Sequence, residues 1–562
     1  MFLISVILFT QKNAKKVLKI KLDLEKLFLA AFLAVFLLIG SGYLFDNRIK
    51  HDFPYAYLAS DAFQHQVRAE SIKDAGNYKN EASYIVMGIK NVIGYYPPLL
   101  YNLSVILSYL SGLEVYDTIY LLVFLMAAAA SLLMYFVIRH FSKNVAIISL
   151  PFSFLVFSGG LYSGFTWGHW PAIVSQLFLI GVFWYTSKMD LEKSWVFLGL
   201  FLGAAIMTHT SEALFALIYL FLFFILITIT KKLKFAVIKN IFLGGIIAFL
   251  ITSYYLVIFK YVWLESQTGG FGVMRRWDNP TIYLSDFGLL LFFMAVGALM
   301  SLLFIRKNFI PALASLTMLI IGLGNYFGFR EKAFQLRFFW PVLLSFLIGF
   351  GIYNLLKLLI KDWKQVYSIG IAVLLGAIIV LGFAPFMPQY QKIQTNGLMD
   401  PYHWDVFKWL AKNTGKDEKI YFFYGDIYGQ DALLRNSKRT HYQVVPEDVV
   451  DAINKREIRK SYDSEMPGDS GTSAPYRKSF FSFGFGLQEL PREQLIGKKD
   501  ICSFEYIVFD KVSMKPALAQ YSLIVASELL KKDYMSKIFE NEIVVVLKNN
   551  NVGADCIEQR NF

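Results

Sequence analysis

Charged residues are scarce in this chain of 562 residues: they make up 17% of it, while hydrophobic residues make up 56%. Soluble domains usually contain about a quarter charged residues, so this shortage excludes an ordinary soluble protein. The sequence also lacks a GxxxxGK(S/T) phosphate loop, an HExxH zinc motif, a CxxC pair and a glycine-rich dinucleotide motif. These absences argue against an ATPase, a zinc protease and a redox enzyme.

Cysteine is almost absent as well. The two cysteines, Cys502 and Cys556, both lie in the charged C-terminal region. In an oxidising compartment such a pair forms a disulfide bond, but two buried thiols explain the same pair equally well. The sequence leaves both alternatives open.

Basic residues are in excess, with a formal net charge of +13, and they fall mainly in short loops beside apolar runs. This is the positive-inside pattern of membrane proteins, with attraction to anionic lipid phosphates added. It argues against nucleic acid as a partner. The predicted inner loops carry Arg139 and Lys143, Lys188 and Lys193, Lys231 to Lys239, Arg306 and Lys307, and Lys357 to Lys364.

Long apolar runs dominate the first 386 residues. A helix needs about 20 apolar residues to cross a bilayer, and the sequence predicts about eleven spans in a polytopic α-helical domain over 1–386. They lie near 27–45, 116–138, 145–163, 172–187, 194–209, 213–230, 240–260, 285–305, 309–325, 337–356 and 366–386. Lysines before the first span place the N-terminus in the cytoplasm, and an odd number of spans places the C-terminus outside the cell membrane.

The composition changes after residue 386: residues 387–562 are richer in charge and contain no span. Helix-like stretches alternate there with short β-branched or aromatic runs, which predicts an extracytoplasmic soluble α/β domain. The expected helices are Trp404–Asn413, Glu447–Lys460 and Leu523–Lys532, and the expected strands are Lys419–Tyr424, Tyr506–Asp510 and Ile543–Lys548.

A large polar loop, 46–100, separates the first span from the rest and faces outside in this topology. Asp61, His65 and Arg68 stand at positions i, i+4 and i+7, which lie on one face of a helix. A carboxylate, an imidazole and a guanidinium held together can transfer a proton or bind phosphate or a cation. A solvated loop helix with an Asp–His contact explains the same spacing.

Polar residues gather at the predicted outer ends of the spans. Besides Asp61 and His65, this group includes His169, His209, Arg275, Arg330 and Arg337. Each one singly is explained as a wetted loop residue. Together they predict a polar cavity that is open to the outside and holds both carboxylates and cations.

Several of these residues stand in recognisable motifs. Asp61 and His65 form Asp-x-x-x-His, followed by GYYPPL at 94–99 and SGL at 111–113. This arrangement resembles the first outer loop of the GT-C superfamily of membrane glycosyltransferases. GHWP at 168–171, TH at 208–209 and RFFWP at 337–341 are similar to the archaeal and bacterial branch known as 6-pyruvoyl-tetrahydropterin-synthase-related membrane proteins.

The resemblance implies a glycosyltransferase that takes a sugar from a polyprenyl-phosphate-linked donor to a glycan, lipid or protein acceptor at the outer membrane face. Asp61 matches the acidic residue of the family's first outer loop, which acts either as a general base or as a metal ligand. In the second case Asp61 and His65 would bind Mn²⁺ or Mg²⁺. A reaction without a metal is the alternative. Candidates for the donor phosphate are Arg68, Arg275, Arg330 and Arg337. The motifs further imply substrate contacts at Tyr96, His169 and His209.

The sequence also departs from its relatives. The first loop has SDAF at 60–63 in place of an Asp-x-Asp pair, and YGDIYG at 424–429 stands where an oligosaccharyltransferase would carry Trp-Trp-Asp-Tyr-Gly. Oligosaccharide transfer to asparagine is therefore disfavoured. Two alternatives to a transferase are a flippase or exporter of lipid-linked sugars and a non-catalytic relative whose exported domain binds a partner.

Overall fold

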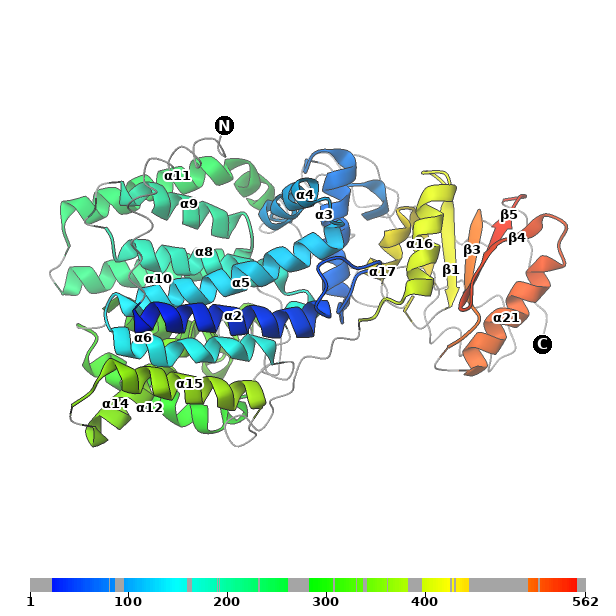
Figure 1. Cartoon of the computed structure of the whole chain (residues 1–562). Helices are drawn as coiled ribbons and strands as arrows, with labels where there is room; N and C mark the ends of the chain where they lie inside the picture. The colour runs from blue at the N-terminus through cyan, green and yellow to red at the C-terminus, as the bar shows by residue number, and fades with distance from the viewer. Residues whose placement is uncertain are drawn as a thin grey trace, which may run out of the picture.

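The structure is a computed structural model that combines a helical bundle with a mixed β-sheet near the C-terminus (Figure 1). It describes residues 23–79, 81–85, 94, 96–158, 164–189, 191, 193–230, 233–260, 283–306, 309–329, 331–336, 341–360, 362–382, 397–424, 427–428, 431–443, 504–513 and 516–552.

Apolar helices occupy every stretch that the sequence predicts to span the membrane. They are α2 (Leu24–Phe45), α5 (Val115–Arg139), α6 (Lys143–Ser149) continued by η2 (Leu150–Phe157), α8 (Trp170–Thr186), α9 (Ser194–Ile206), α10 (Thr210–Ile229), α11 (Phe235–Phe259), α12 (Leu289–Leu303), α13 (Phe309–Gly322), α14 (Ser345–Leu359) and α15 (Gln365–Leu381). An α-helix satisfies its own backbone hydrogen bonds inside a bilayer. This set of apolar helices therefore makes the chain a multi-pass membrane protein.

Helix length divides this set. Four of the described helices, α2, α5, α10 and α11, are long and apolar enough to cross a membrane, and the others contain 10 to 17 residues. α9 and α10 are separate helices, in agreement with the separate spans predicted near 194–209 and 213–230. α14 begins at Ser345, later than the expected start at 337.

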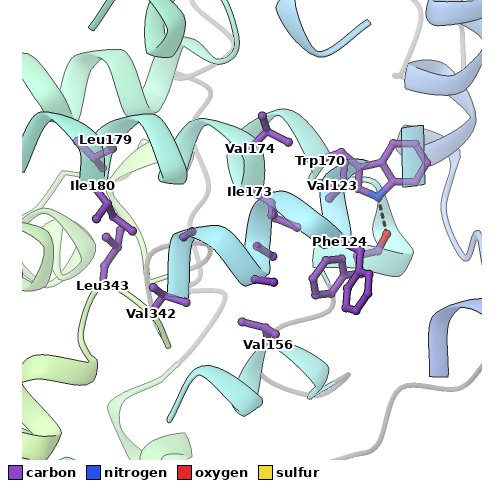
Figure 2. Packing of buried hydrophobic residues seen from close by; sticks show 14 of the residues in the cluster. Val123, Phe124, Val156, Trp170, Ile173, Val174, Leu179, Ile180, Val342 and Leu343 are labelled. Atoms are coloured by element: carbon purple, nitrogen blue, oxygen red, sulfur yellow. Dashed lines mark hydrogen bonds between the residues drawn. The ribbon is translucent and has the colours of Figure 1, made fainter. Parts of the chain in front are cut away.

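The bundle core forms where α8 packs against α5 and the segment before α14. Figure 2 shows Val123 and Phe124 of α5 facing Ile173 of α8, with Leu343 beside Ile180. All five side chains are buried. These contacts fix α8 within the bundle, and they thereby fix the position of the loop that precedes α8.

Two further helices, α3 (Ser60–Ala75) and α4 (Leu99–Ser111), lie together at one end of the bundle (Figure 1). Gly76 follows the last residue of α3 and Gly112 follows the last residue of α4, both in the left-handed conformation that glycine adopts at little cost. Pro98 precedes α4, where its missing N–H breaks no helical hydrogen bond. The helix that the spacing of Asp61, His65 and Arg68 predicts within the polar loop 46–100 is thus present as α3.

The sheet has five strands in the order β2-β1-β3-β5-β4. β1 runs parallel to β2 and β3, and β5 runs antiparallel to β3 and β4. Helices α16 and α21 pack on the sheet. The strands are β1 (Lys419–Tyr424), β2 (Thr440–Gln443), β3 (Tyr506–Asp510), β4 (Met535–Glu540) and β5 (Val544–Asn549). The remaining described elements are η1 (Ser83–Ile85), α7 (Gly164–Trp167), η5 (Leu284–Phe287), η6 (Gly324–Phe327), η7 (Lys332–Phe334), α16 (Pro401–Asn413), α17 (Asp431–Leu434), η8 (Arg435–Ser437) and α21 (Pro516–Leu530).

The predicted β1 and β3 have the observed bounds, and the predicted third strand is displaced by one residue from β5. α16 begins three residues before the expected Trp404, because Asp400 caps it by accepting a hydrogen bond from the backbone N–H of His403. The sequence analysis missed β2 and β4. The helix expected at Glu447–Lys460 lies outside the described residues.

The sheet region contacts the bundle at the end that carries α3 (Figure 1). Lys438 Nζ lies 2.9 Å from carboxylate oxygens of both Glu70 and Asp74 on α3. The rings of Tyr116 and Trp404 meet edge to face with centroids 5.4 Å apart. These contacts bring charged groups from the C-terminal region directly onto the helix that carries the predicted site.

Candidate functional site

Asp61 stands in the first turn of α3, and its side chain is exposed. The backbone at Asp61–Ala62 packs against Gly168: a Cβ added there would lie 2.1 Å from the nitrogen of Ala62. Gly168 also has φ +85, a conformation that other residues rarely adopt. Only glycine therefore allows the loop before α8 to approach the start of α3 this closely.

Trp170 fixes the same loop from the other side. Its indole N–H donates a hydrogen bond of 2.6 Å to the carbonyl oxygen of Phe165, which Figure 2 shows as a dashed line. The Trp170 ring contacts both His65 and Tyr57, at centroid distances of 6.2 and 4.9 Å. The buried tryptophan thus ties the loop of Gly168 and His169 to α3.

His65 lies one turn after Asp61 and is buried, with 7% of its surface exposed. Its Nδ1 is 2.7 Å from the hydroxyl of Tyr101 on α4, and its ring meets the ring of Tyr96 edge to face at 5.4 Å. Burial lowers the pKa of His65 well below its usual value, and the nearby charges of Arg68 and His209 lower it further. The imidazole is therefore neutral at physiological pH.

Arg68 also lies on α3, but it does not present an isolated positive charge. Its guanidinium donates a hydrogen bond of 2.6 Å to the Glu81 carboxylate, and both side chains are at most 9% exposed. The guanidinium carbon lies 5.5 Å from the centre of the Tyr96 ring. The pairing with Glu81 weakens the expected role of Arg68 as a phosphate clamp, because the two charges cancel.

His209 caps the start of α10, and its Nδ1 is hydrogen bonded to Oε2 of Glu212. Glu212 is completely buried, and its Oε1 has no hydrogen-bond partner among the residues that the structure describes. The backbone carbonyl of Met207, just before His209, accepts a hydrogen bond of 2.9 Å from the N–H of Leu99. The turn between α9 and α10 therefore joins the same cluster as α3 and α4.

A divalent metal is not favoured by the side chains seen here. Among the residues that the structure describes, no three His, Cys, Asp or Glu side chains come together as a metal site. Asp61 and His65 offer one oxygen donor group and one buried imidazole, whereas Mg²⁺ prefers an octahedral set of oxygens. The expected Mn²⁺ or Mg²⁺ site at Asp61 and His65 stays a prediction, and the reaction proposed below uses no metal-dependent step.

The structure brings part of the predicted site together. Asp61, His65, Arg68, Tyr96 and His209 gather around the start of α3 and α4, through the contacts given above. His169 lies next to Gly168 and faces Trp167, with ring centroids 6.2 Å apart. Arg275, Arg330 and Arg337 lie outside the described residues, as do Cys502 and Cys556.

Sequence reasoning missed Tyr101 and Glu81 as members of this site, and it gave Glu212 no role. Glu212 stands three residues after His209, a spacing that places both on one helical face, so it was open to prediction. Glu81 meets Arg68 across a loop of 13 residues, and no periodic signal links such a pair. Tyr101 reaches His65 from α4, a separate helix, and no periodic signal links that pair either.

No family model matches the chain, and a search of curated proteins found no match. Solved structures do resemble it. The apo crystal structure of ArnT from Cupriavidus metallidurans is similar with a TM-score of 0.52 and 12% sequence identity, over 93% of this chain and 98% of ArnT. ArnT bound to undecaprenyl phosphate matches with a TM-score of 0.50 and 12% identity, over 94% of this chain and 99% of ArnT.

A second similar protein is the Archaeoglobus fulgidus oligosaccharyltransferase in its apo form. It matches with a TM-score of 0.52 and 11% identity, over 91% of this chain and 73% of that protein. At these identities the likeness concerns the fold alone. The chain is thus a multi-pass membrane protein with a fold similar to that of the GT-C glycosyltransferases.

Proposed function

We propose that this protein is a membrane glycosyltransferase that moves a sugar from a polyprenyl-phosphate-linked donor to an acceptor hydroxyl at the outer membrane face. The observation that carries the proposal is the exposed Asp61 at the start of α3, in a fold that ArnT shares along nearly its whole length. The structure of ArnT with undecaprenyl phosphate supports this class of donor.

Asp61 is the general base in this proposal, and its neighbours explain the choice. Its carboxylate is exposed, whereas the imidazole of His65, one turn away, is buried and in contact with Tyr101. Gly168 and the Trp170 hydrogen bond hold the first turn of α3 in one position. A general base must stand within hydrogen-bond reach of the proton that it removes, so a fixed first turn favours Asp61.

The reaction itself is a displacement at the anomeric carbon. Asp61 takes the proton of the acceptor hydroxyl, the acceptor oxygen forms a bond to the anomeric carbon, and the bond from that carbon to the donor phosphate oxygen breaks. Polyprenyl phosphate leaves with the electron pair. Because Arg68 is neutralised by Glu81, we assign the leaving phosphate to Arg275, Arg330 or Arg337.

The sequence motifs refine this proposal to the 6-pyruvoyl-tetrahydropterin-synthase-related branch, with the N-terminus in the cytoplasm. The loop 46–100 and the sheet region then face outside. Departures from the oligosaccharyltransferase motifs disfavour asparagine as the acceptor. A panel of donors that differ in their sugar identifies which sugar is transferred.

The test is the substitution Asp61→Asn, which keeps the shape of the side chain and removes the base. Full-length protein in membranes is incubated with a panel of undecaprenyl-phosphate-linked sugars, and release of undecaprenyl phosphate is measured. General-base catalysis typically contributes 10²- to 10⁴-fold, so release should fall by about 10²-fold or more.

Asp52→Asn is the matched control, since Asp52 is an exposed aspartate of the same loop. It should retain the parental rate. A folded Asp61→Asn protein with the parental rate removes Asp61 from the mechanism. A parent protein that releases no undecaprenyl phosphate from any donor contradicts the proposed function.

A further inference from the structure

A pocket opens between α3, α4 and the loop that joins them. Its wall includes Arg68, Ser71, Glu81, Tyr96 and Tyr101. The pocket is thus bounded by two helices and by the described part of their connecting loop.

Two hydrogen bonds from backbone N–H groups of the loop shape the pocket, one to α3 and one within the loop. The hydroxyl oxygen of Ser71 accepts a hydrogen bond of 2.8 Å from the N–H of Ala82, next to Glu81. The N–H of Gly94 donates to the carbonyl of Lys79 at 3.0 Å. A Cβ at Gly94 would lie 3.0 Å from the carbonyl oxygen of Tyr78, so a larger residue would press on the pocket wall.

The described part of the pocket wall carries balanced charges. Among the described lining residues, Arg68 and Glu81 are the charged ones, and they form a buried ion pair. A phosphate in this pocket would face the Glu81 carboxylate as well as the guanidinium. A buried pair of this kind instead offers N–H donors beside carboxylate acceptors, which suits hydroxyl groups, because each hydroxyl both donates and accepts.

Aromatic side chains complete the wall. Tyr78, Tyr96 and Tyr101 all line the pocket, and the Tyr96 ring covers the Arg68 guanidinium. Tyrosines offer an apolar face together with a polar hydroxyl. A small number of fixed polar groups among aromatic rings is the usual composition of an orienting ligand site.

We infer that this pocket binds a neutral sugar ring, with the Arg68–Glu81 pair contacting ring hydroxyls and the tyrosines covering its C–H face. The inference deepens the proposed function and rests on it for the role of the sugar. Tyr101 links the pocket to the candidate site, because its hydroxyl also contacts His65. Arg68 is seven residues after Asp61, roughly 10 Å along the helix, so the pocket lies about two turns from the proposed base. The same chemistry fits the donor sugar and a sugar of a glycan acceptor.

The test uses full-length protein in nanodiscs and saturation-transfer NMR with neutral methyl glycosides of hexoses, pentoses and N-acetylhexosamines. Glucose 1-phosphate serves as the anionic comparison. At least one neutral glycoside should receive saturation more strongly than glucose 1-phosphate does. Its signal should fall at least fivefold in the double variant Arg68→Met/Glu81→Leu.

The double variant removes both charges at once, because a lone buried charge would destabilise the fold, whereas apolar replacement of a buried pair is often neutral or stabilising. Tyr109→Leu is the control: Tyr109 is an exposed tyrosine of α4 that does not line the pocket. This variant should keep the parental signal. Thermal unfolding of each variant confirms that it is folded.

The inference is overturned if no glycoside of the panel is saturated, if the signal survives in the folded double variant, or if glucose 1-phosphate is saturated more strongly. Competition then identifies the source of the ring. An undecaprenyl-phosphate-linked sugar that displaces the glycoside, where bare undecaprenyl phosphate does not, assigns the pocket to the donor; glycoside that neither lipid displaces assigns it to the acceptor. Glycoside binding with no transfer from any donor contradicts the proposed function and leaves the sugar pocket standing.

Discussion

The hydroxyl of Tyr101 lies 2.7 Å from Nδ1 of His65, and this contact joins α4 to α3 in the interior of the site. Burial and the charges of Arg68 and His209 lower the pKa of His65 well below 6.5, so the imidazole in this pair is neutral at neutral pH. A proton on His65 would be buried beside Arg68. The stability of this end of the bundle is therefore linked to pH.

We expect the α3–α4 region to lose stability as the pH falls below about 6.5, because the unfolded region then binds a proton that the folded region excludes. Hydrogen exchange of α3, compared between pH 7.5 and pH 5.5, should show faster opening at the lower pH. His65→Gln should flatten this dependence. His140→Gln, at an exposed histidine, should not; equal slopes in all three proteins would contradict the buried neutral state of His65.

Gly168 and Gly76 form a matched pair of left-handed glycines. Both have positive φ, +85 and +67, but a Cβ at Gly168 would collide with Ala62 while nothing lies within 4 Å of one at Gly76. Gly76→Ala should cost about 1–2 kcal/mol of backbone strain, and Gly168→Ala should cost about 1–3 kcal/mol more from overpacking.

The measurements for this pair are the melting temperature and the rate of sugar transfer. Gly168→Ala should lower both, because it displaces the turn that carries Asp61, and Gly76→Ala should lower the melting temperature alone. Equal effects of the two substitutions would show that the close approach of Gly168 to α3 does not position the site.

Lys438 carries the link between the sheet region and α3. Burial lowers its pKa, but Glu70 and Asp74 outweigh burial and raise it, so the ion pairs persist at neutral pH. Lys438→Gln should speed hydrogen exchange in the second half of α3, most clearly at low salt, because screening weakens the pairs in the parent. Lys511→Gln is the control: it breaks a pair with Glu540 within the sheet region and should leave α3 unchanged.

Much of this architecture could be predicted because it depends on local patterns. The apolar runs located the helices, and alternating β-branched and aromatic residues gave the bounds of β1 and β3. β2 contains Thr440–Gln443, a short and polar run, and becomes a strand only because β1 offers it a parallel partner. β4 likewise depends on pairing with β5 rather than on its own hydrophobicity.

The site shows the same division. Asp61, His65 and Arg68 share one helix, so spacing alone placed them together. Spacing does not show that Arg68 pairs with Glu81 across a loop, or that His65 contacts Tyr101 on another helix. Burial and partners across loops determine the protonation state and the pairing of a titratable group, and local spacing predicts neither.

The proposed membrane orientation places Asp61 at the outer face of the membrane. In a protein with Cys502 and Cys556 replaced by serine, single cysteines are introduced at Lys416 and Lys234, which are both exposed. A membrane-impermeant maleimide added to intact cells should label position 416 directly and position 234 only after the membrane is opened. The opposite pattern would place Asp61 in the cytoplasm and contradict transfer at the outer face.

His403 joins two carboxylates in the sheet region. Its Nδ1 is 2.5 Å from Asp400 and its Nε2 is 3.0 Å from Asp510, a residue at the end of β3 that is 1% exposed. Burial lowers the pKa of His403, but the hydrogen bonds to Asp400 and Asp510 outweigh it and raise the pKa to about 9. The positively charged imidazole therefore holds α16 to the central strand.

This raised pKa predicts an alkaline weakness of the sheet region. The folded protein keeps the proton that the unfolded protein loses near pH 6.5, so the stabilisation is complete below that pH and is lost as the pH rises through about 9. At about 1.4 kcal/mol per pKa unit, the loss is on the order of 3 kcal/mol.

Hydrogen exchange of β3, measured from pH 6 to pH 9.5 and corrected for intrinsic rates, should report this loss of stability. His403→Gln should remove the dependence, and His441→Gln, at a buried histidine of β2 whose Nδ1 contacts the backbone oxygen of Arg439, should preserve it. A β3 that opens equally at both ends of this range in the parent protein would mean that His403 is neutral and that its two carboxylates do not hold a charge in place.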